Sequence, residues 1–230
     1  MSTVLIVGSG GREHALASKL AESVETTRLV LAPGNDGTEE NLRQRFKGLE
    51  VERWSFDPAQ VESGFEDLAR QAKDAGVDLV VIGPDNPLAD GIVDVFEACG
   101  LLTFGPTAAA ARIESSKSFA KDVMLKAGVP TARCEMAHTL EEAERFISRV
   151  EWGSGWVVKA DGLAFGKGVV VCEDREQALQ AARDLFHLSG SLVIEERLVG
   201  KELSWMALCD GERVALMDPV RDYKPLLNGQ

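Results

Sequence analysis

A glycine-rich stretch with two lysines is the segment of the sequence best suited to bind phosphate. It runs Lys159-Ala-Asp-Gly-Leu-Ala-Phe-Gly-Lys-Gly168 and lies between two short apolar runs. Gly162, Gly166 and Gly168 allow a hairpin loop to close over phosphate oxygens, and Lys159 and Lys167 bring positive charge to them. A P-loop is disfavoured, because it needs four residues between its glycines, then Lys-Ser/Thr and a helix. The alternative is a surface hairpin that binds no ligand.

A second glycine-rich segment, Gly8-Ser-Gly-Gly-Arg-Glu-His14, follows a β-branched run near the N-terminus. Between a strand and a helix, such glycines let backbone N–H groups and the helix N-terminus contact an anion. A dinucleotide site needs G-x-G-x-x-G, but the sixth position here is Glu13, and Ala32-Pro33 follows the next strand in place of a ribose-binding acid. NAD binding is therefore disfavoured. The alternatives are an anion site and a tight turn without a ligand, in which His14 has a structural role.

Three acids near the end of the sequence form a weaker signal. Val193-Ile-Glu195-Glu196 is an apolar run that ends in two acids, and Glu202 follows seven residues after Glu195. A strand edge at this point can bind adenine, and a carboxylate can accept hydrogen bonds from ribose hydroxyls. Taken alone the pattern is weak, because charged strand ends are usually solvated. Because the pattern follows the glycine-rich hairpin, it indicates a nucleotide site more strongly than it would alone.

The elements that must position these residues alternate in the first half of the sequence. Apolar runs predict strands over residues 3–7, 28–31, 77–82 and 101–104, and amphipathic spacing predicts helices over 12–21, 61–75 and 89–98. Residues 33–37 predict a turn, because they are Pro-Gly-Asn-Asp-Gly. Strands that alternate with helices are typical of a parallel, doubly wound α/β sheet. We expect this sheet over residues 1–105.

After Pro106 the pattern changes to α+β. One long helix is predicted over residues 108–127, and another over 140–150, with Thr139 as its N-cap and Glu142 completing a capping box. Strands are predicted over 156–159, 169–172 and 192–195, and a helix over 176–186. The first two of these strands have no helix between them, so they predict a hairpin around the glycine-rich loop.

Composition narrows the class of protein. The chain has 230 residues, with 25 Lys+Arg and 37 Asp+Glu, which gives a net charge of −12. A protein with this net negative charge repels the phosphate backbone of nucleic acids, so nucleic acid is disfavoured as a partner. No apolar run approaches the about 20 residues of a membrane helix, and no secretory signal is recognisable, so we expect a cytoplasmic protein that does not bind membranes. The four cysteines lie 35 or more residues apart, which disfavours zinc sites and disulfides.

Six motifs follow one another along the chain. They are Gly8-Ser-Gly-Gly-Arg-Glu-His-Ala15, Ala32-Pro-Gly-Asn-Asp-Gly-Thr38, Gly83-Pro-Asp-Asn-Pro-Leu88, Phe104-Gly-Pro-Thr107, Ser116-Lys117 and Val158-Lys-Ala-Asp-Gly-Leu-Ala-Phe-Gly-Lys-Gly-Val169. In this order they resemble the signatures of the phosphoribosylamine–glycine ligase family, from residue 1 to about residue 224. The resemblance implies a Rossmann-like pre-ATP-grasp domain over 1–105. It also implies an incomplete ATP-grasp domain over 106–230, with its lid subdomain over about 131–195.

The resemblance implies an ATP-dependent ligase of purine biosynthesis. ATP phosphorylates the glycine carboxylate, and the amine of 5-phosphoribosylamine then attacks the glycyl phosphate to give glycinamide ribonucleotide, ADP and phosphate. ATP and Mg²⁺ are the implied cofactors, and the partners are small-molecule substrates. Such a reaction depends mainly on positioning and on neutralisation of phosphate charge.

The resemblance also implies which residues bind these molecules, although it assigns no catalytic residue. The residues implied for ATP are Lys117, Lys159, Gly162, Gly166, Lys167 and Gly168 at the phosphates, Glu195 and Leu198 at adenine, and Glu202 at ribose. The residues implied for the sugar phosphate and its surroundings are Gly8, Gly10, Gly11, Asn35, Asp85, Asp222 and Lys224.

The sequence departs from the family pattern at several points. Asp85 replaces the Glu of a Gly-Pro-Glu motif, Tyr223 replaces a His, and the stretch between Phe186 and Leu192 is shorter. The family's Gly-Pro-Asn-Thr-Gly-Gly-Met-Gly run and its magnesium-binding Glu and Asn are not found up to Gln230. We therefore expect no metal site in this chain, magnesium ligands beyond residue 230, and no complete phosphoryl transfer by this chain alone. The expected protein partner is the missing C-terminal half, or a second copy contacted through residues 196–230.

Two other functions stay open at this point. One is a nucleotide- or sugar-phosphate-binding module without catalysis, and the other is an ATP-grasp ligase for a different amine. The Gly-Gly-Arg-Glu-His segment favours glycine ligation by resemblance.

Overall fold

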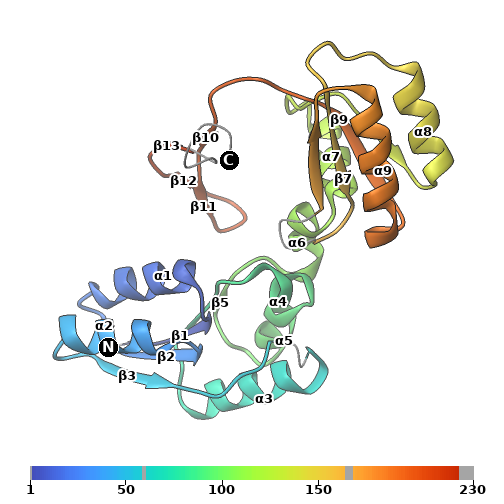
Figure 1. Cartoon of the computed structure of the whole chain (residues 1–230). Coiled ribbons are helices and arrows are strands. Elements are labelled where there is room, and N and C mark those ends of the chain that lie inside the picture. The colour runs from blue at the N-terminus through green and yellow to red at the C-terminus, as the bar shows by residue number, and fades with distance from the viewer. Residues whose placement is uncertain (1, 59–60, 164–167, 223–230) are drawn as a thin grey trace. The chain divides into compact units, whose positions relative to one another are not determined.

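The structure, a computed structural model, describes residues 2–58, 61–163 and 168–222. The chain divides into two compact units (Figure 1). The first comprises Met1–Thr131 and Asp161–Gly168, and the second comprises Ala132–Ala160 and Val169–Gln230. The predicted domain boundaries at residues 105 and 131 stay predictions. Among the described residues, none of the helices combines the length and the hydropathy that a bilayer span requires.

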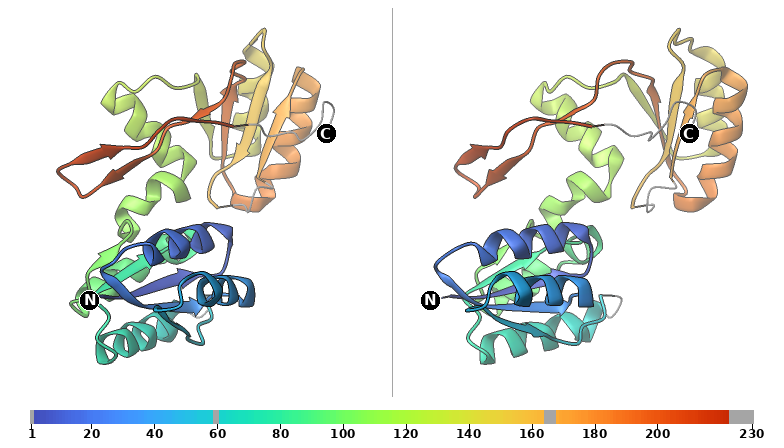
Figure 2. Two further views of the ribbon diagram at one scale, coloured as in Figure 1. Left: turned by 90° about the vertical axis from the view of Figure 1, so that its left-hand side faces the viewer. Right: turned by 60° about the vertical axis from the view of Figure 1, so that its left-hand side comes forward.

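A five-stranded parallel sheet forms the centre of the first unit, as Figure 2 shows from two further sides. Its strands are β1 (Ser2–Gly8), β2 (Thr26–Pro33), β3 (Glu50–Arg53), β4 (Leu79–Ile82) and β5 (Thr103–Phe104). They lie in the order β3-β2-β1-β4-β5, and every neighbouring pair is parallel. The chain thus proceeds to opposite sides of β1, which makes the carboxyl end of β1 a topological switch point. The predicted doubly wound α/β fold is confirmed.

Helices cover this sheet and complete two hydrophobic cores. They are α1 (Gly11–Ala21), α2 (Asp36–Arg45), α3 (Val61–Asp74), α4 (Asp85–Ala89) and α5 (Ile92–Ala98). One core joins Leu5 and Val7 of β1 to Phe65 of α3 and Phe96 of α5. The other joins the alternate β1 residues Val4 and Ile6 to residues of α1 and α2. Both faces of β1 are therefore buried, as expected for a central parallel strand.

The predicted single helix over residues 108–127 is wrong at Ser116. The structure has two helices, α6 (Ala108–Ser115) and α7 (Lys117–Ala127). Ser116 between them has an extended backbone (φ −134°, ψ 111°), and its side-chain oxygen accepts a hydrogen bond from the Phe119 N–H. Ser116 therefore ends α6 and caps α7, because an N-cap residue leaves the helical conformation.

Three other local predictions need correction. Residues 33–37 are not a turn throughout, because Asp36 begins α2 and Asn35 caps it by accepting from the Thr38 N–H at 2.8 Å. The predicted helix over 89–98 begins only at Ile92, as α5, because Gly91 before it has a φ of +88°, and α4 (Asp85–Ala89) was not predicted. Strands β3 and β6 (Cys134–Ala137) were not predicted, because they are short and do not form apolar runs.

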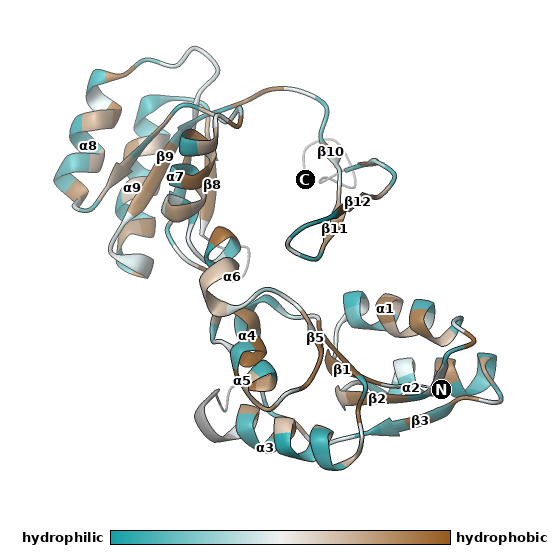
Figure 3. Cartoon of the chain, turned by 180° about the vertical axis from the view of Figure 1, so that it is seen from behind, coloured by the Kyte–Doolittle hydropathy of each residue, from teal (hydrophilic) through white to brown (hydrophobic). Residues whose placement is uncertain are grey.

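The second unit contains an antiparallel sheet in the order β6-β9-β7-β8. Besides β6, its strands are β7 (Trp156–Ala160), β8 (Val169–Cys172) and β9 (Leu192–Glu196), and Figure 3 shows β8 and β9 as largely hydrophobic. Helices α8 (Leu140–Arg149) and α9 (Arg175–Ser189) pack with the side chains of Trp156, Val158 and Ile194 in one core. Strands β7 and β8 pair antiparallel, so the predicted hairpin is confirmed.

Four further strands of this unit form two-stranded ribbons. They are β10 (Leu203–Ser204) paired with β13 (Val220–Arg221), and β11 (Ala207–Cys209) paired with β12 (Val214–Leu216). All residues from 198 to 221 are exposed. They include the apolar side chains of Leu198, Val199, Leu203, Trp205, Met206, Leu208, Val214, Leu216, Met217 and Val220. Two-stranded ribbons are marginal on their own, so this segment lacks the burial that stabilises the two sheets.

The hydrogen bonds of Thr139 allow a test of what stabilises the second unit. Its hydroxyl oxygen accepts from the Glu142 N–H at 3.1 Å, and the Glu142 carboxylate accepts from the Thr139 N–H at 3.3 Å, so the predicted capping box is confirmed. Thr139→Ala is expected to lower the free energy of unfolding by about 1 kcal/mol, measured by urea denaturation. Thr139→Ser keeps the hydroxyl and is expected to lose less. Equal losses in the two variants would contradict the capping role.

Candidate functional site

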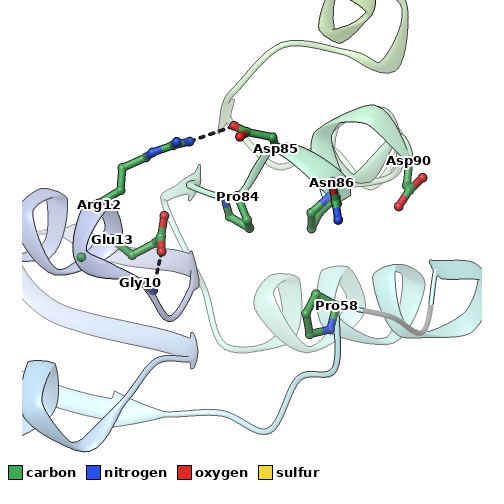
Figure 4. Close-up of a pocket in the computed structure, with 10 residues that line it drawn as sticks. Gly10, Arg12, Glu13, Pro58, Pro84, Asp85, Asn86 and Asp90 are labelled. Carbon is green, nitrogen blue, oxygen red and sulfur yellow. Dashed lines mark hydrogen bonds and ion pairs between the residues drawn. The ribbon is translucent and has the colours of Figure 1, made fainter. Parts of the chain in front are cut away.

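A cavity of about 710 Å³ lies in the first unit, beyond the carboxyl ends of β1 and β4 (Figure 4). Residues 10–13 line it from the β1–α1 turn and the start of α1, residues 84–87 and Asp90 line it after β4, and Pro58 lies beside them. In open α/β sheets, ligands bind beyond the carboxyl ends of the strands at a switch point. The fold therefore places this cavity where a ligand is expected.

Arg12 is the positively charged residue in the wall of this cavity. Its Nη1 donates to the Asp85 carboxylate at 2.8 Å and to the Gly83 carbonyl oxygen at 2.8 Å. The hydrogen bond with Asp85 and its negative charge raise the pKa of Arg12. The side chains of Arg12 and Asp85 are 61% and 44% exposed, so this ion pair is screened by water and weak. A ligand with a stronger acceptor or donor can therefore replace either partner.

Glu13 is the buried acid of the same wall, and only 7% of the residue is exposed. One of its carboxylate oxygens accepts from the Gly10 N–H at 2.6 Å (Figure 4). In the sequence, Glu13 stands out only as a departure from the dinucleotide pattern, and it was not predicted as a residue of the site. A signal for it was present, because an acid three residues after an N-cap position is typical of a capping box.

The structure brings four of the predicted substrate residues to the β1–α1 turn or next to it. Gly8 ends β1, Gly10 is the N-cap of α1, and Gly11 is the first residue of that helix. The Asn35 side-chain amide donates to the Ser9 carbonyl oxygen at 2.8 Å, which links the start of α2 to this turn.

The other predicted substrate residues are distributed differently. Asp85 begins α4 and lines the cavity, as predicted from its motif. Asp222 belongs to the second unit, where its N–H donates to the Glu202 carbonyl oxygen at 3.3 Å. Lys224 lies outside the described residues. His14 contacts Thr38 of α2 through its Nδ1, at 3.0 Å from Oγ1, and so joins two helices.

Lys117 and Gly162, two of the predicted phosphate-binding residues, are in direct contact within the first unit. The Lys117 ammonium donates to the Gly162 carbonyl oxygen at 2.6 Å. Next to it, the Asp161 carboxylate accepts from the Ser118 N–H at 3.2 Å, from the Ser118 hydroxyl, and from the Ser116 hydroxyl at 3.4 Å. The residues before the glycine-rich loop are thus bound to the start of α7.

The charge of Asp161 fits this position. Burial by itself raises the pKa of its carboxyl, but hydrogen bonds from the Ser118 side chain and from the N–H groups of Ser118, Lys117 and Gly162 outweigh burial, so the pKa is lowered. The N-terminus of a helix carries a partial positive charge, which favours an ionised carboxylate there. Asp161 is therefore a charged anchor between the loop and α7.

Lys159 and Glu195, predicted at the phosphates and at adenine, form an ion pair on neighbouring strands of the second unit. The Lys159 ammonium lies 2.9 Å from the Glu195 carboxylate, and the two side chains are 25% and 8% exposed. Lys159 is paired with Val193 and Glu195 with Val157, so both belong to the same face of the sheet. Trp156, Val158 and Ala160 alternate with them and pack in the core with α8 and α9. The ion pair thus lies on the face opposite these helices.

The remaining predicted nucleotide residues lie at or beyond the ends of these strands. Gly168 is buried immediately before β8, and Leu198 and Glu202 lie in the exposed segment after β9. Gly166 and Lys167 lie outside the described residues. Across residues 2–58, 61–163 and 168–222, no group of three or more His, Cys, Asp or Glu side chains is arranged to hold a metal ion.

Comparison with known proteins identifies relatives along the whole chain. The family model described as phosphoribosylglycinamide synthetase, N domain, matches residues 2–114, and the one for the ATP-grasp (A) domain of the same enzyme matches residues 115–230. The phosphoribosylamine–glycine ligase of Ralstonia nicotianae is 45% identical over 232 residues, and that of Rhodopirellula baltica is 42% identical over 236. Each match covers 98% of this chain and 51% of the relative, so the chain spans about half the length of these proteins.

Solved structures agree with this result. The crystal structure of phosphoribosylamine–glycine ligase from Thermotoga maritima has a TM-score of 0.73 and 29% identity, over 99% of this chain and 52% of that one. An N5-carboxyaminoimidazole ribonucleotide synthetase in complex with ADP has a TM-score of 0.71 over 98% of this chain and 55% of its own, and its 18% identity supports the fold alone. The expected partial ATP-grasp fold and the resemblance seen in the six motifs are confirmed. The chain therefore belongs to the phosphoribosylamine–glycine ligase family, also described as phosphoribosylglycinamide synthetase.

Proposed function

We propose that this chain is part of an enzyme that ligates glycine to 5-phosphoribosylamine with ATP, through a glycyl phosphate, in purine biosynthesis. The observation that carries the proposal is the match of both family models, which together extend over residues 2–230. The local geometry supports it, because the lysines of the family motifs are held by specific hydrogen bonds and ion pairs.

At the phosphate end of ATP, we propose roles for Lys117, Lys159 and the loop that contains Gly162, Gly166, Lys167 and Gly168. The support for Lys117 is its contact with a neutral carbonyl oxygen, that of Gly162. A phosphate oxygen is a stronger acceptor than a carbonyl because it is charged, so ATP can replace Gly162 as the partner of Lys117. Asp161 acts as a positioning residue. It belongs to the glycine-rich loop and accepts a hydrogen bond from Ser118, the residue that follows Lys117.

At the nucleoside end, we propose that Glu195 and Leu198 line the adenine pocket and that Glu202 binds ribose. The Lys159–Glu195 pair supports the first of these roles. It places a cation for phosphate and an acceptor for an amino group next to each other on one face of the sheet.

For the sugar-phosphate substrate, we propose binding by Gly8, Gly10, Gly11, Asn35 and Asp85, with Asp222 and Lys224 contributing from the C-terminal segment. The cavity of about 710 Å³ supports this role for the first group, because it lies within the range of about 300–1,000 Å³ that small-molecule pockets occupy. Arg12, Asp85 and Asn86 supply polar groups to it.

Magnesium is the metal cofactor that the family resemblance implies. The described residues contain no group of three or more His, Cys, Asp or Glu side chains that could hold a metal ion. We propose that the metal ligands belong to the part of the enzyme beyond residue 230, and we assign no step to the metal here.

We also propose that the exposed apolar segment, residues 198–220, packs against that same part of the enzyme. Its apolar side chains include Trp205 and Leu216, which are 63% and 68% exposed. Exposed apolar side chains that gather in one segment are typical of an interaction site. The longer relatives supply an occupant, because the chain spans only 51% of their length.

The proposed reaction is tested by measuring phosphate release that requires ATP, glycine and 5-phosphoribosylamine together, using the protein at the length of its curated relatives. Lys117→Met removes a charged donor and is expected to lower kcat/KM for ATP by about tenfold or more, because such contacts contribute about 1.5–3 kcal/mol. Lys126→Met, an exposed residue near the end of α7, is the control and should leave kcat/KM unchanged. Phosphate release that does not depend on glycine would overturn the proposal.

The anchoring role of Asp161 predicts a pH dependence of stability. A carboxyl with a lowered pKa stabilises the fold fully above the unfolded pKa of about 3.9, and this contribution is lost as the pH falls through the lower folded-state pKa. Wild-type protein should therefore be more stable than Asp161→Asn at pH 7, and the difference should shrink below about pH 4. Urea unfolding over a pH series measures it. Asp122→Asn, at an exposed position of α7, is the control, and a pH-independent difference for Asp161→Asn would contradict the role.

The proposal for residues 198–220 predicts where a protease cuts first. In the 230-residue chain, limited proteolysis should begin within this exposed segment, whereas the same sites should be protected at the length of the relatives. Mass spectrometry of the early fragments identifies the sites. First cuts within residues 2–105, or equal cleavage of the segment in both proteins, would count against the proposal.

A further inference from the structure

Glu13 occupies a place that an anionic ligand would take in other folds of this type. It lies where the ends of β1 and β4 meet the start of α1, and only 7% of the residue is exposed. The N–H groups at the start of a helix bind anions because they have no partner within the helix. In this chain, the Gly10 N–H already donates to the Glu13 carboxylate at 2.6 Å (Figure 4).

The glycines around Glu13 leave room for its side chain. A Cβ atom added to Gly83 would lie 2.0 Å from Oε1 of Glu13, and one added to Gly8 would lie 2.6 Å from Cγ. Gly8 also needs to be glycine for its backbone, because its φ is +124°. Gly83 has no positive φ, so the contact with Glu13 is the reason that no side chain fits there.

The backbone groups of Gly83 connect the end of β1 to Arg12 in the cavity wall. Its N–H donates to the Val7 carbonyl oxygen at 3.0 Å, and its own carbonyl oxygen accepts from Arg12 at 2.8 Å. Arg12 in turn pairs with Asp85. Glu13, Gly83, Arg12 and Asp85 are therefore connected by successive contacts.

The charges of the cavity disfavour a phosphate group beside the turn. Among the described residues that line it, the carboxylates are those of Glu13, Asp85 and Asp90, and the guanidinium is that of Arg12. The three negative charges and one positive charge of these described residues repel an anion, most strongly close to the buried carboxylate. Hydroxyl and amine groups, in contrast, donate hydrogen bonds to carboxylates.

We propose that Glu13 is a positioning residue that fills the anion position of the β1–α1 turn from within the protein. It keeps phosphate away from the Gly10 N–H, so that the hydroxyl and amine side of the ligand, and not its phosphate, lies against this wall. The ligand's identity as an aminated sugar phosphate rests on the proposed function. The two experiments below use no enzymatic activity, so their failure is distinguishable from failure of the proposed function.

The packing of Gly83 against Glu13 is tested by a double-mutant cycle on thermal stability. Gly83→Ala is expected to lower the melting temperature of the wild-type chain by about 4 °C or more, and that of Glu13→Ala by less than about 2 °C. Gly11→Ala is the matched control, because a Cβ there meets no atom within 4 Å, and it should be tolerated in both backgrounds. Glu13→Asp serves as a second background if Glu13→Ala does not fold. Equal effects of Gly83→Ala in both backgrounds would overturn the packing argument.

The exclusion of phosphate is tested by titrating inorganic phosphate while recording the backbone amide resonances of the ¹⁵N-labelled chain. In the Glu13→Ala variant, or in Glu13→Asp if the former does not fold, phosphate should shift the amides of Gly10, Gly11 and Arg12 more than in the wild type at the same concentrations. An Asp90→Asn variant is the control for a general loss of negative charge, since Asp90 lines the cavity but makes no contact with Gly10. Equal responses of wild type and the Glu13 variant, including no response in either, would overturn the proposal, as would an equal gain in Asp90→Asn.

Discussion

The N–H groups at the start of a helix have no partner within the helix, and at the start of α1 the Glu13 carboxylate supplies one for Gly10. The arrangement of the site around it depends on this contact. Because the carboxylate lies between the ends of two parallel strands, neither Gly8 nor Gly83 can carry a side chain. The Gly83 carbonyl oxygen then holds Arg12, and Arg12 holds Asp85. One buried acid thus places the charged groups at the switch point of the sheet.

At the start of α7, a backbone N–H group is likewise bound by a carboxylate, but this carboxylate comes from a distant segment of the chain. Asp161 accepts from the Ser118 N–H, 43 residues earlier in the chain, whereas Glu13 reaches back only 3 residues to Gly10. The local contact shapes a turn, and the distant one connects two segments of the first unit. Lys117 and Gly162 are neighbours for this reason. In each case a carboxylate at a helix N-terminus is stabilised by the helix dipole, and a residue of a family motif is positioned beside it.

The predicted nucleotide residues are found in two units that have separate hydrophobic cores. Lys117 and Gly162 belong to the unit built on the parallel sheet, and Lys159 and Glu195 to the unit built on the antiparallel sheet. Each pair is held by contacts within its own unit. The exposed ribbons that follow β9 contain apolar side chains that these cores do not cover. The relatives are about twice as long, since the match covers 51% of each.

Local patterns in the sequence were sufficient for the class of fold, the hairpin and the family. Apolar runs of 4–6 residues predicted β1, β2 and β4, because buried parallel strands are hydrophobic on both faces, and the Thr139 capping box was predicted because all its groups lie within four residues. The break at Ser116 was not predicted, although its cap to Phe119 is a local contact. The short strands β3 and β6 were not predicted either, since they do not form apolar runs and depend on partner strands elsewhere in the sequence. The same limit applies to the site. Residue types and spacing indicated Lys159 and Glu195 as candidates, and the family resemblance indicated Lys117. Only the tertiary structure showed that Lys159 faces Glu195, that Asp161 anchors the helix of Lys117, and that Glu13 is the reason for Gly83. A motif carries information about neighbours along the chain, whereas the packing of a side chain depends on segments that folding brings together.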